Sequence, residues 1–319
     1  MKYYYAFGIV IGCNLELPLP EYSGEEKDCL EIRLLEKSVE VPDGFVLRNS
    51  FLIEGNGDDD MGSYYERGDE KWVRYRAVCD FWIRPLEQKM DCYYRVPENL
   101  ELAEIYLLSD CISAYLRHVK QYVFHAAAVR LGNKSYVFSA EKGGGKSTLL
   151  ASLVNSGGDV ISDDLVPLFL AEQGVMLRSS FPSVKLNSGQ FPLATDWISD
   201  ARPVLKGSLK KSCTLKSERY AEGDFPLDAF FVIHPVTADE PIQVRKLNAA
   251  EGFVALLQCI FSGTTASNSE IIAYQKVIRR ILKENLAFQL DIPRDLEQLP
   301  NVIDVLKHFD NGKEESKNG

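Results

Sequence analysis

The chain has 319 residues, 45% of them hydrophobic, which is enough for two ordinary domains or one large one. Its net charge of −10 gives no general electrostatic support for binding nucleic acid or an anionic membrane. The seven cysteines are scattered and include no C-x-x-C pair, which predicts reduced thiols in a cytoplasmic protein without disulfides or a zinc site. We see no signal peptide, and no apolar run approaches the roughly 20 residues that span a bilayer.

The first part of the chain, residues 1–96, is predicted to form a smaller, mostly-β N-terminal domain. Short apolar and aromatic runs with partial alternation are typical of half-buried strands. The aromatic side chains fit either a peptide-recognition groove or the core of a small sheet, and core packing is the simpler explanation. Residues 97–309 are predicted to form a second domain, which opens with a helix from Leu100 to Val119, and the polar tail 310–319 is predicted to be disordered.

Two β-prone runs, 125–129 and 136–139, flank a turn containing Gly132-Asn133, which predicts a hairpin. If Arg130 pairs with Ser135, His125 lies opposite Ala140, where the next motif begins. A slip of one residue would turn His125 to the other face of the sheet. A lone histidine near an apolar run is usually structural, and this register is what favours a role in a site.

The hairpin leads into Ala140-Glu141-Lys142-Gly143-Gly144-Gly145-Lys146-Ser147-Thr148, which has the spacing of a phosphate-binding loop. Consecutive glycines let the backbone aim its N–H groups at phosphate oxygens. Lys146 is expected to reach the β- and γ-phosphates of a nucleotide, and the Ser147 hydroxyl to ligate Mg²⁺. A helix is predicted to start at Ser147, and its N-terminus favours the same anion.

An acidic pair, Asp163-Asp164, follows the predicted strand Val160-Ile161. In a strand–helix–strand unit the strands are parallel, so we expect the pair at the same sheet edge as the loop. One carboxylate there can hold Mg²⁺ and the other can accept a proton, with their pKa values pushed apart. An exposed turn is the alternative explanation.

A hairpin is then expected from 166–170 and 175–178, and Lys185 falls in a further strand. A local concentration of basic residues follows between Lys206 and Arg219. We select Lys185 and Lys211 as candidate phosphate or substrate contacts. The alternative is that this segment is a solvated loop. Two helices, a strand and a final helix complete the predicted domain.

These motifs together resemble the HPr kinase/phosphorylase superfamily, and most of all the HPr-kinase-like proteins that accompany lasso-peptide gene clusters. The resemblance rests on the His125-Ala126-Ala127-Ala128-Val129 strand, the Gly145-Lys146-Ser147 loop and the Ser162-Asp163-Asp164 sequence after one helix. The opening stretches, 5–8 and 15–20, are also similar to that subgroup. The Glu-x-Arg-Gly-x-Gly signature of the bifunctional enzymes does not follow the acidic pair, which puts HPr as substrate and phosphorolysis in doubt.

The resemblance implies an α/β (α+β) fold, with a mixed sheet and a P-loop nucleotide-binding core of HPr-kinase type behind the β-rich domain. It implies that Gly143, Gly144, Gly145, Lys146, Ser147 and Thr148 bind the phosphates of ATP, and that Ser147 and Asp164 ligate Mg²⁺. By the same resemblance Asp163 is the base that activates the acceptor hydroxyl, and His125 lies beside the transferred phosphate.

The function predicted is an ATP-dependent serine kinase acting on a peptide, and the resemblance alone implies the C-terminal Ser of a lasso-peptide precursor as acceptor. The alternatives are a kinase for another protein Ser or a small-molecule alcohol, and a nucleotide-dependent binding or regulatory protein without phosphotransfer. The expected partner is the peptide substrate, without nucleic acid or membrane, and a homo-oligomer is left open.

Overall fold

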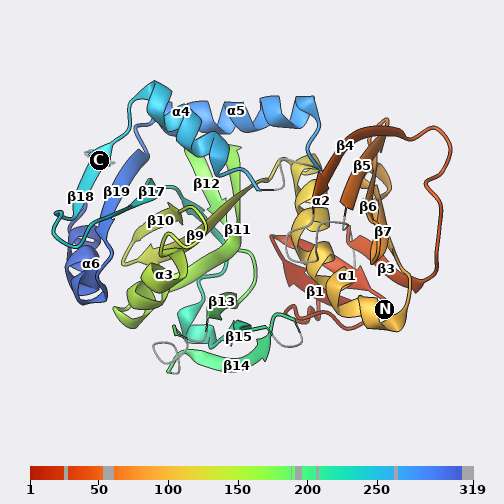
Figure 1. Ribbon diagram of the computed structural model, residues 1–319, viewed down its shortest axis with the longest axis horizontal. Coiled ribbons are helices and arrows are strands. Elements are labelled where there is room, and N and C mark those ends of the chain that lie inside the picture. The colour runs from red at the N-terminus through yellow and green to blue at the C-terminus, as the bar shows by residue number, and fades with distance from the viewer. Residues whose placement is uncertain are drawn as a thin grey trace. The chain divides into compact units, whose positions relative to one another are not determined.

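The computed structural model describes residues 1–24, 28–52, 61–187, 189–190, 196–205, 208–261 and 265–310. Most of the tail predicted to be disordered, residues 311–319, lies outside these ranges, as does Lys206 of the basic segment. The protein is mixed α/β with two large mixed sheets, in agreement with the predicted class (Figure 1).

The chain divides into two compact units. Unit 1 comprises Met1–Val123 and Phe261–Ala273, and unit 2 comprises Phe124–Ile260 and Tyr274–Gly319. The division differs from the predicted boundary between 96 and 97, because residues 97–123 group with the first unit. The tyrosine rings of Tyr75 and Tyr106 stack at 3.8 Å, and Tyr75 Oη donates a hydrogen bond to Asp110. Through these contacts the helix predicted from Leu100 to Val119 packs against the N-terminal strands.

Unit 1 contains a sheet of eight strands in the order β1-β2-β3-β8-β7-β6-β5-β4. Helix α1 (Leu100–Tyr106) and helix α2 (Ile112–His118) are joined by a π-helical segment, Leu107–Cys111, so the predicted helix is nearly continuous. The strands are β1 (Lys2–Ala6), β2 (Ile9–Cys13), β3 (Leu30–Glu36), β4 (Val46–Leu52), β5 (Met61–Arg67), β6 (Glu70–Tyr75), β7 (Cys79–Arg84) and β8 (Lys89–Tyr94).

Unit 2 contains a second eight-stranded sheet, β16-β12-β11-β9-β10-β17-β19-β18, and a three-stranded sheet, β13-β15-β14. In the larger sheet β10 pairs parallel with β17, and β17 pairs parallel with β19. The strands are β9 (Tyr122–Leu131), β10 (Lys134–Ser139), β11 (Asp159–Ala171), β12 (Gly174–Arg178), β13 (Ser183–Asn187), β14 (Ile198–Pro203), β15 (Lys210–Leu215), β16 (Asp224–Pro226), β17 (Ala229–Val236), β18 (Gln243–Lys246) and β19 (Ala287–Pro293).

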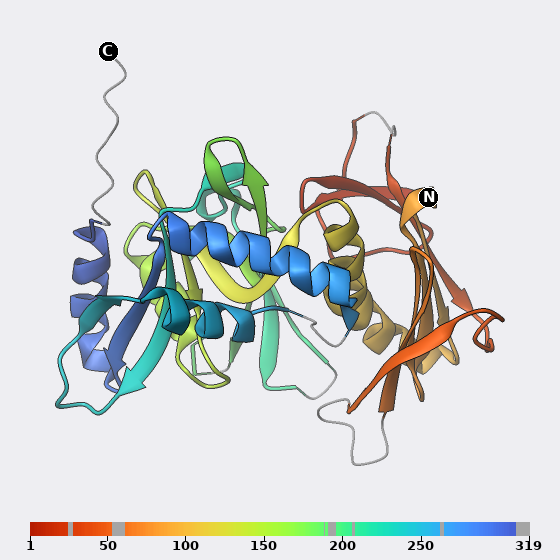
Figure 2. The same cartoon turned by 90° about the horizontal axis from the view of Figure 1, so that it is seen from above.

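Helices cover both faces of this sheet (Figure 1). On one face α3 (Lys146–Asn155) and α6 (Leu299–Lys307) bury their leucines and valines against a cluster of aromatic rings. Phe231 lies at its centre, with ring centroids 5.3 Å from Phe138 and 5.1 Å from Phe309. On the other face α4 (Ala249–Gln258) lies beside α5 (Asn268–Lys283) in both views (Figures 1 and 2). The strands of unit 2 that carry the loop are therefore covered by helices on both faces.

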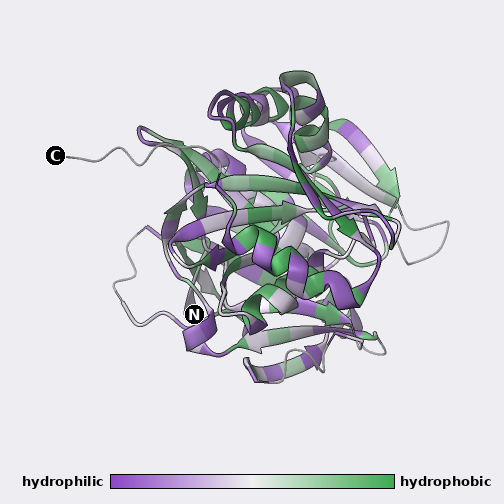
Figure 3. Ribbon diagram, turned by 90° about the vertical axis from the view of Figure 1, so that its left-hand side faces the viewer, coloured by the Kyte–Doolittle hydropathy of each residue, from purple (hydrophilic) through white to green (hydrophobic). Residues whose placement is uncertain are grey.

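The helices carry hydrophobic and hydrophilic residues in alternating bands, as one buried face requires (Figure 3). In α5 the buried residues are Tyr274, Val277, Ile278 and Ile281, which recur at helical spacing. None of the described helices combines the length and the apolar character that crossing a bilayer requires.

Candidate functional site

The glycine-rich loop lies between β10 and α3, and the hairpin before it has the predicted register. Ser135 pairs with Arg130 and Phe138 pairs with Ala127, so the hairpin prediction is confirmed. Counting on by two residues places His125 opposite Ala140. Ser139 Oγ also donates a hydrogen bond to the His125 carbonyl at 2.8 Å. The register therefore brings His125 to the start of the loop.

The loop needs its three glycines for two different reasons. Gly143 and Gly145 have φ of 82° and 90°, a left-handed region that residues with a Cβ seldom adopt. At Gly144 an added Cβ would lie 2.9 Å from Ala140 Cβ and 3.0 Å from the Glu141 carbonyl oxygen. The N-cap of α3 is Gly145, which has no side chain to cap the first amides, so these N–H groups are left for an anion.

Lys146 is the first residue of α3, and its ammonium contacts both His125 and the acidic pair. Its Nζ lies 3.2 Å from His125 Nε2 and 3.5 Å from Asp164 Oδ1. A lysine ammonium can only donate, so Nε2 accepts and the proton of the neutral imidazole is on Nδ1. Desolvation by the surrounding protein atoms, and then the charge of Lys146, lower the pKa of His125 to about 4, although the residue is partly exposed to solvent. His125 is therefore an uncharged neighbour of the loop near neutral pH.

The acidic pair lies within a long strand and does not follow a short one. We predicted a short strand that ends at the pair and directly neighbours the strand before the loop in a strand–helix–strand unit. Instead β11 runs on from Asp159 to Ala171, and β9 lies between β10 and β11 in the sheet. Asp164 interrupts the extended backbone with φ of 63°. The hairpin predicted after the pair is confirmed, since Leu170 pairs with Val175.

The two carboxylates of the pair have different surroundings. Asp163 is half-buried as a residue, and its Oδ2 accepts a hydrogen bond from the Lys185 backbone amide at 2.9 Å. Its Oδ1 is fully enclosed and has no hydrogen-bond partner within the described ranges. Asp164 lies 2.9 Å from Lys185 Nζ, 3.5 Å from Lys146 Nζ and 4.0 Å from Lys210 Nζ. Three cations thus surround one carboxylate, an excess of positive charge that suits a polyanion.

The pKa values of the pair move in opposite directions, as expected from the sequence. Burial, and then the negative charge of Asp164, raise the pKa of Asp163 above its usual range. Burial alone would raise the pKa of Asp164 too, but Lys185, Lys146 and Lys210 outweigh it and hold that pKa well below the usual range. Near neutral pH Asp164 is therefore the more firmly ionised of the two, and Asp163 binds a proton more readily.

The small sheet supplies the remaining lysines of the site. The lysine of β15 that lies near Asp164 is Lys210, whereas we had predicted Lys211. Lys185 pairs with Ser212 and Asn187 with Lys210, so Lys185 and Lys210 lie on the same face of the β13–β15 pair. Lys211 lies on the opposite face, because side chains alternate along a strand. The basic residues alone did not indicate which of the two neighbours faces the pair; the register of the hairpin does.

Ser147 and Thr148 follow Lys146 in the first turn of α3. The Thr148 hydroxyl accepts a hydrogen bond from Gln190 Nε2 at 2.8 Å, a contact that the sequence did not suggest. The described residues contain no group of three His, Cys, Asp or Glu side chains arranged to hold a metal. A hard divalent cation would instead take oxygen ligands from Asp164 and Ser147 together with nucleotide phosphates. The adjacent residue, Asp163, adds a buried oxygen, Oδ1, that has no hydrogen-bond partner in the described structure. The residues present fit Mg²⁺ in this way.

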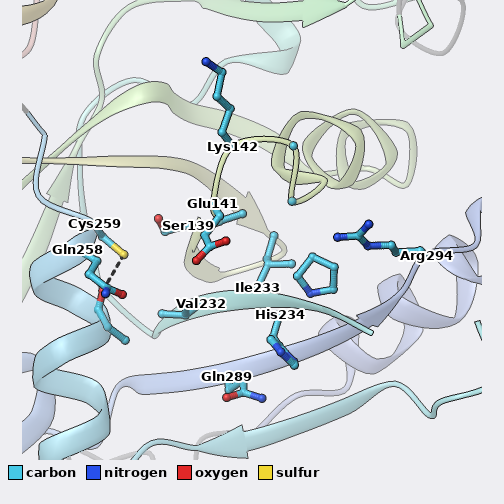
Figure 4. Close-up of a pocket in the computed structure, with 15 residues that line it drawn as sticks. Ser139, Glu141, Lys142, Val232, Ile233, His234, Gln258, Cys259, Gln289 and Arg294 are labelled. Carbon is cyan, nitrogen blue, oxygen red and sulfur yellow. Dashed lines mark hydrogen bonds between the residues drawn. The ribbon is translucent and has the colours of Figure 1, made fainter. Parts of the chain in front are cut away.

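Two cavities adjoin the loop on the side of β17 and β19. The larger, of about 650 Å³, is lined by polar groups that include Glu141, His234 and Gln289 (Figure 4). The smaller, of about 270 Å³, is lined mainly by apolar side chains. Gly143, Gly144 and Arg294 border both, and the Arg294 side chain extends toward the loop (Figure 4). No sequence pattern pointed to Arg294, which reaches the loop because β19 is a neighbour of β17.

Comparison with known proteins gives one structural neighbour to report. No family model matches the chain, and no curated protein matches it in sequence. Among solved structures, the HPr(Ser) kinase/phosphatase from Coxiella burnetii is similar with a TM-score of 0.30 and 11% identity. The match covers 58% of this chain and 95% of that one. At this level of similarity the chemistry of the site has to be argued from its own residues.

Proposed function

We propose that this protein is an ATP-dependent kinase that transfers the γ-phosphoryl group of ATP to the hydroxyl of a serine in a peptide. The observation that carries the proposal is the meeting of a phosphate loop with a carboxylate pair, through the 3.5 Å contact between Lys146 and Asp164. A protein that only binds nucleotide needs the loop, but it has no use for a buried carboxylate of raised pKa beside it.

The loop amides and Lys146 bind and orient the phosphates, and Lys185 and Lys210 balance the negative charge that the γ-phosphate brings to Asp164. Ser147 and Asp164 would hold Mg²⁺, which would supply further charge neutralisation for the phosphates. His125, neutral and hydrogen-bonded to Lys146, keeps that ammonium directed at the phosphate position.

In the transfer step the serine oxygen forms a bond to the γ-phosphorus while the bond from that phosphorus to the β,γ-bridging oxygen breaks. The bridging oxygen leaves with the electron pair as part of ADP, and the serine proton passes to Asp163. The raised pKa of Asp163 supports this assignment, because a base works best when its pKa approaches the working pH. Asp163 Oδ1, which has no hydrogen-bond partner in the described structure, is the oxygen that receives the proton.

The acceptor we propose is the C-terminal serine of a lasso-peptide precursor, which follows from the sequence resemblance alone. The test is the intact mass of such a peptide after incubation with the protein and Mg²⁺-ATP, with ADP measured in parallel. A gain of one phosphate supports the proposal, and fragmentation locates the serine. ADP without a peptide gain points to another acceptor or to hydrolysis, and neither product points to a nucleotide-binding protein without transfer.

The role of Asp163 is tested by Asp163→Asn. The asparagine Oδ1 can still accept the hydrogen bond from the Lys185 amide, so this variant keeps the structural contact and loses the basic oxygen. We expect transfer to fall by about 10²- to 10⁴-fold, the usual contribution of a positioned base, while ATP binding persists. Transfer at the wild-type rate would show that Asp163 only supports β13.

A further inference from the structure

The strands beside the phosphate loop continue past the point where the loop leaves the sheet. Ser139, the last residue of β10, pairs with Val232 of β17, and Val232 pairs with Gln289 of β19. β17 and β19 then run on together to the pair Val236–Pro293. All three strands are parallel, so their carboxyl ends form one edge, where ligands bind in open α/β sheets.

The order of strands decides which end of a nucleotide faces which side of the loop. The acidic pair is on β11, two strands from β10, and β17 and β19 are on the other side of β10. The γ-phosphate belongs with Lys146 and Asp164 on the β11 side. The rest of a nucleoside triphosphate bound along the loop therefore extends over the ends of β17 and β19, where both cavities lie.

The smaller cavity has the chemistry that a nucleobase needs. Its apolar walls come from the strand ends and from the turn that precedes α6, and they face Leu149 on α3. The lining includes Pro235, Ile292, Pro293, Leu296 and Leu299. A base presents two flat faces with little polarity, which gain from apolar contact. The lining of the smaller cavity is mainly apolar, whereas polar and apolar groups share the lining of the larger cavity about equally.

Arg294 connects this cavity with the phosphate loop. It borders both cavities and points toward the loop (Figure 4), and its backbone amide donates a hydrogen bond to the Val236 carbonyl at 3.0 Å. That hydrogen bond ties the start of the turn after β19 to the end of β17. The Arg294 side chain therefore lies where the phosphate loop and the apolar cavity adjoin.

We propose that the cavity between the ends of β17 and β19 and the first turn of α3 binds the base of the nucleotide, with Ile292 and Leu296 against the base and Arg294 against the phosphate chain. This inference rests on the proposed function, since it assigns a binding site to the base of the same nucleotide whose phosphates the loop is proposed to bind. It predicts that the protein binds ATP more tightly than inorganic tripolyphosphate, which has the phosphates and no base.

The test compares the two ligands by calorimetry on the full chain and on Leu296→Asn, which removes the apolar side chain without adding a charge near the phosphates. Leu296 is 71% exposed, so the substitution does not threaten folding. We expect about tenfold weaker ATP binding, as for the loss of one apolar side-chain contact, with tripolyphosphate binding unchanged. Leu86→Asn in unit 1, at a leucine that is 73% exposed, is the matched control and should change the affinity for neither ligand.

Ile292→Thr is a second variant, which keeps a β-branched residue in the strand and should weaken the binding of ATP alone, as Leu296→Asn does. Equal affinity for ATP and tripolyphosphate, with no effect of either variant, would overturn the base site and leave the phosphate loop standing. If the wild-type protein binds neither ligand, the proposed function fails, and this inference with it. The two failures are therefore distinguishable.

Discussion

Lys146 links every part of the candidate site, so its replacement by methionine is the most informative perturbation. Methionine keeps an unbranched chain of similar length and removes the ammonium. In the absence of ligand Asp164 still has Lys185 and Lys210 nearby, at 2.9 and 4.0 Å, so its charge remains balanced. We therefore expect Lys146→Met to fold, and its circular dichroism spectrum and melting curve check this.

The first expected effect is on His125. Burial is the larger cause of its low pKa and the charge of Lys146 is the second. Removing the ammonium should raise the pKa of His125 from about 4, part of the way toward its ordinary value. An NMR titration of the ring proton measures this without any ligand. An unchanged pKa would show that Lys146 does not lie beside His125 in solution.

The second expected effect is on nucleotide binding. A hydrogen bond to a charged group contributes about 1.5–3 kcal/mol. At about 1.4 kcal/mol for each factor of ten, the loss of one such bond weakens ATP binding by roughly 10- to 150-fold. Calorimetry with Mg²⁺-ATP measures the affinity of the variant and of the wild-type protein.

Lys142→Met is the matched control, because it removes the same charge from the same loop. The Lys142 side chain points away from the other labelled residues around the larger cavity (Figure 4). We expect ATP affinity to stay close to wild type. Equal losses for both variants would mean that only the net charge of the loop matters, and no loss in Lys146→Met would refute the phosphate contact.

Two further predictions concern the loop and the core. Gly144→Ala would place a Cβ 2.9 Å from Ala140 Cβ, so the loop must shift, and we expect ATP binding to weaken about tenfold, as for the loss of one hydrogen bond to a charged group. Gly189→Ala adds a Cβ in open space and should leave ATP affinity unchanged in the same calorimetric assay. Phe231→Ala removes a fully buried ring from the aromatic cluster and should lower the free energy of unfolding by about 3–5 kcal/mol in urea denaturation. Val305→Ala, at a partly exposed position of α6, should change it by about 0.5 kcal/mol or less, and equal effects would contradict the assigned core.

Local patterns in the sequence were enough to predict the hairpin from β9 to β10, its register, and the glycine-rich loop before α3. Each of these depends on neighbours in the chain: a turn fixes the pairing of Arg130 with Ser135, and φ values of 82° and 90° restrict positions 143 and 145 to glycine. His125 was placed beside the loop by counting along one hairpin. Such inferences need no knowledge of the distant chain.

The tertiary structure decided what depends on pairing between distant segments. β9 lies between β10 and β11, residues 97–123 group with unit 1, and Lys210 rather than Lys211 faces Asp164. The enclosure of Asp163 Oδ1 and the approach of Arg294 to the loop also arise only when strands remote in sequence become neighbours. A one-residue change of register turns a side chain to the other face of a sheet, so composition and spacing cannot specify these contacts. The sequence by itself determined the glycine-rich loop and the acidic pair, and the packing of the sheets determined which cations and which cavity surround them.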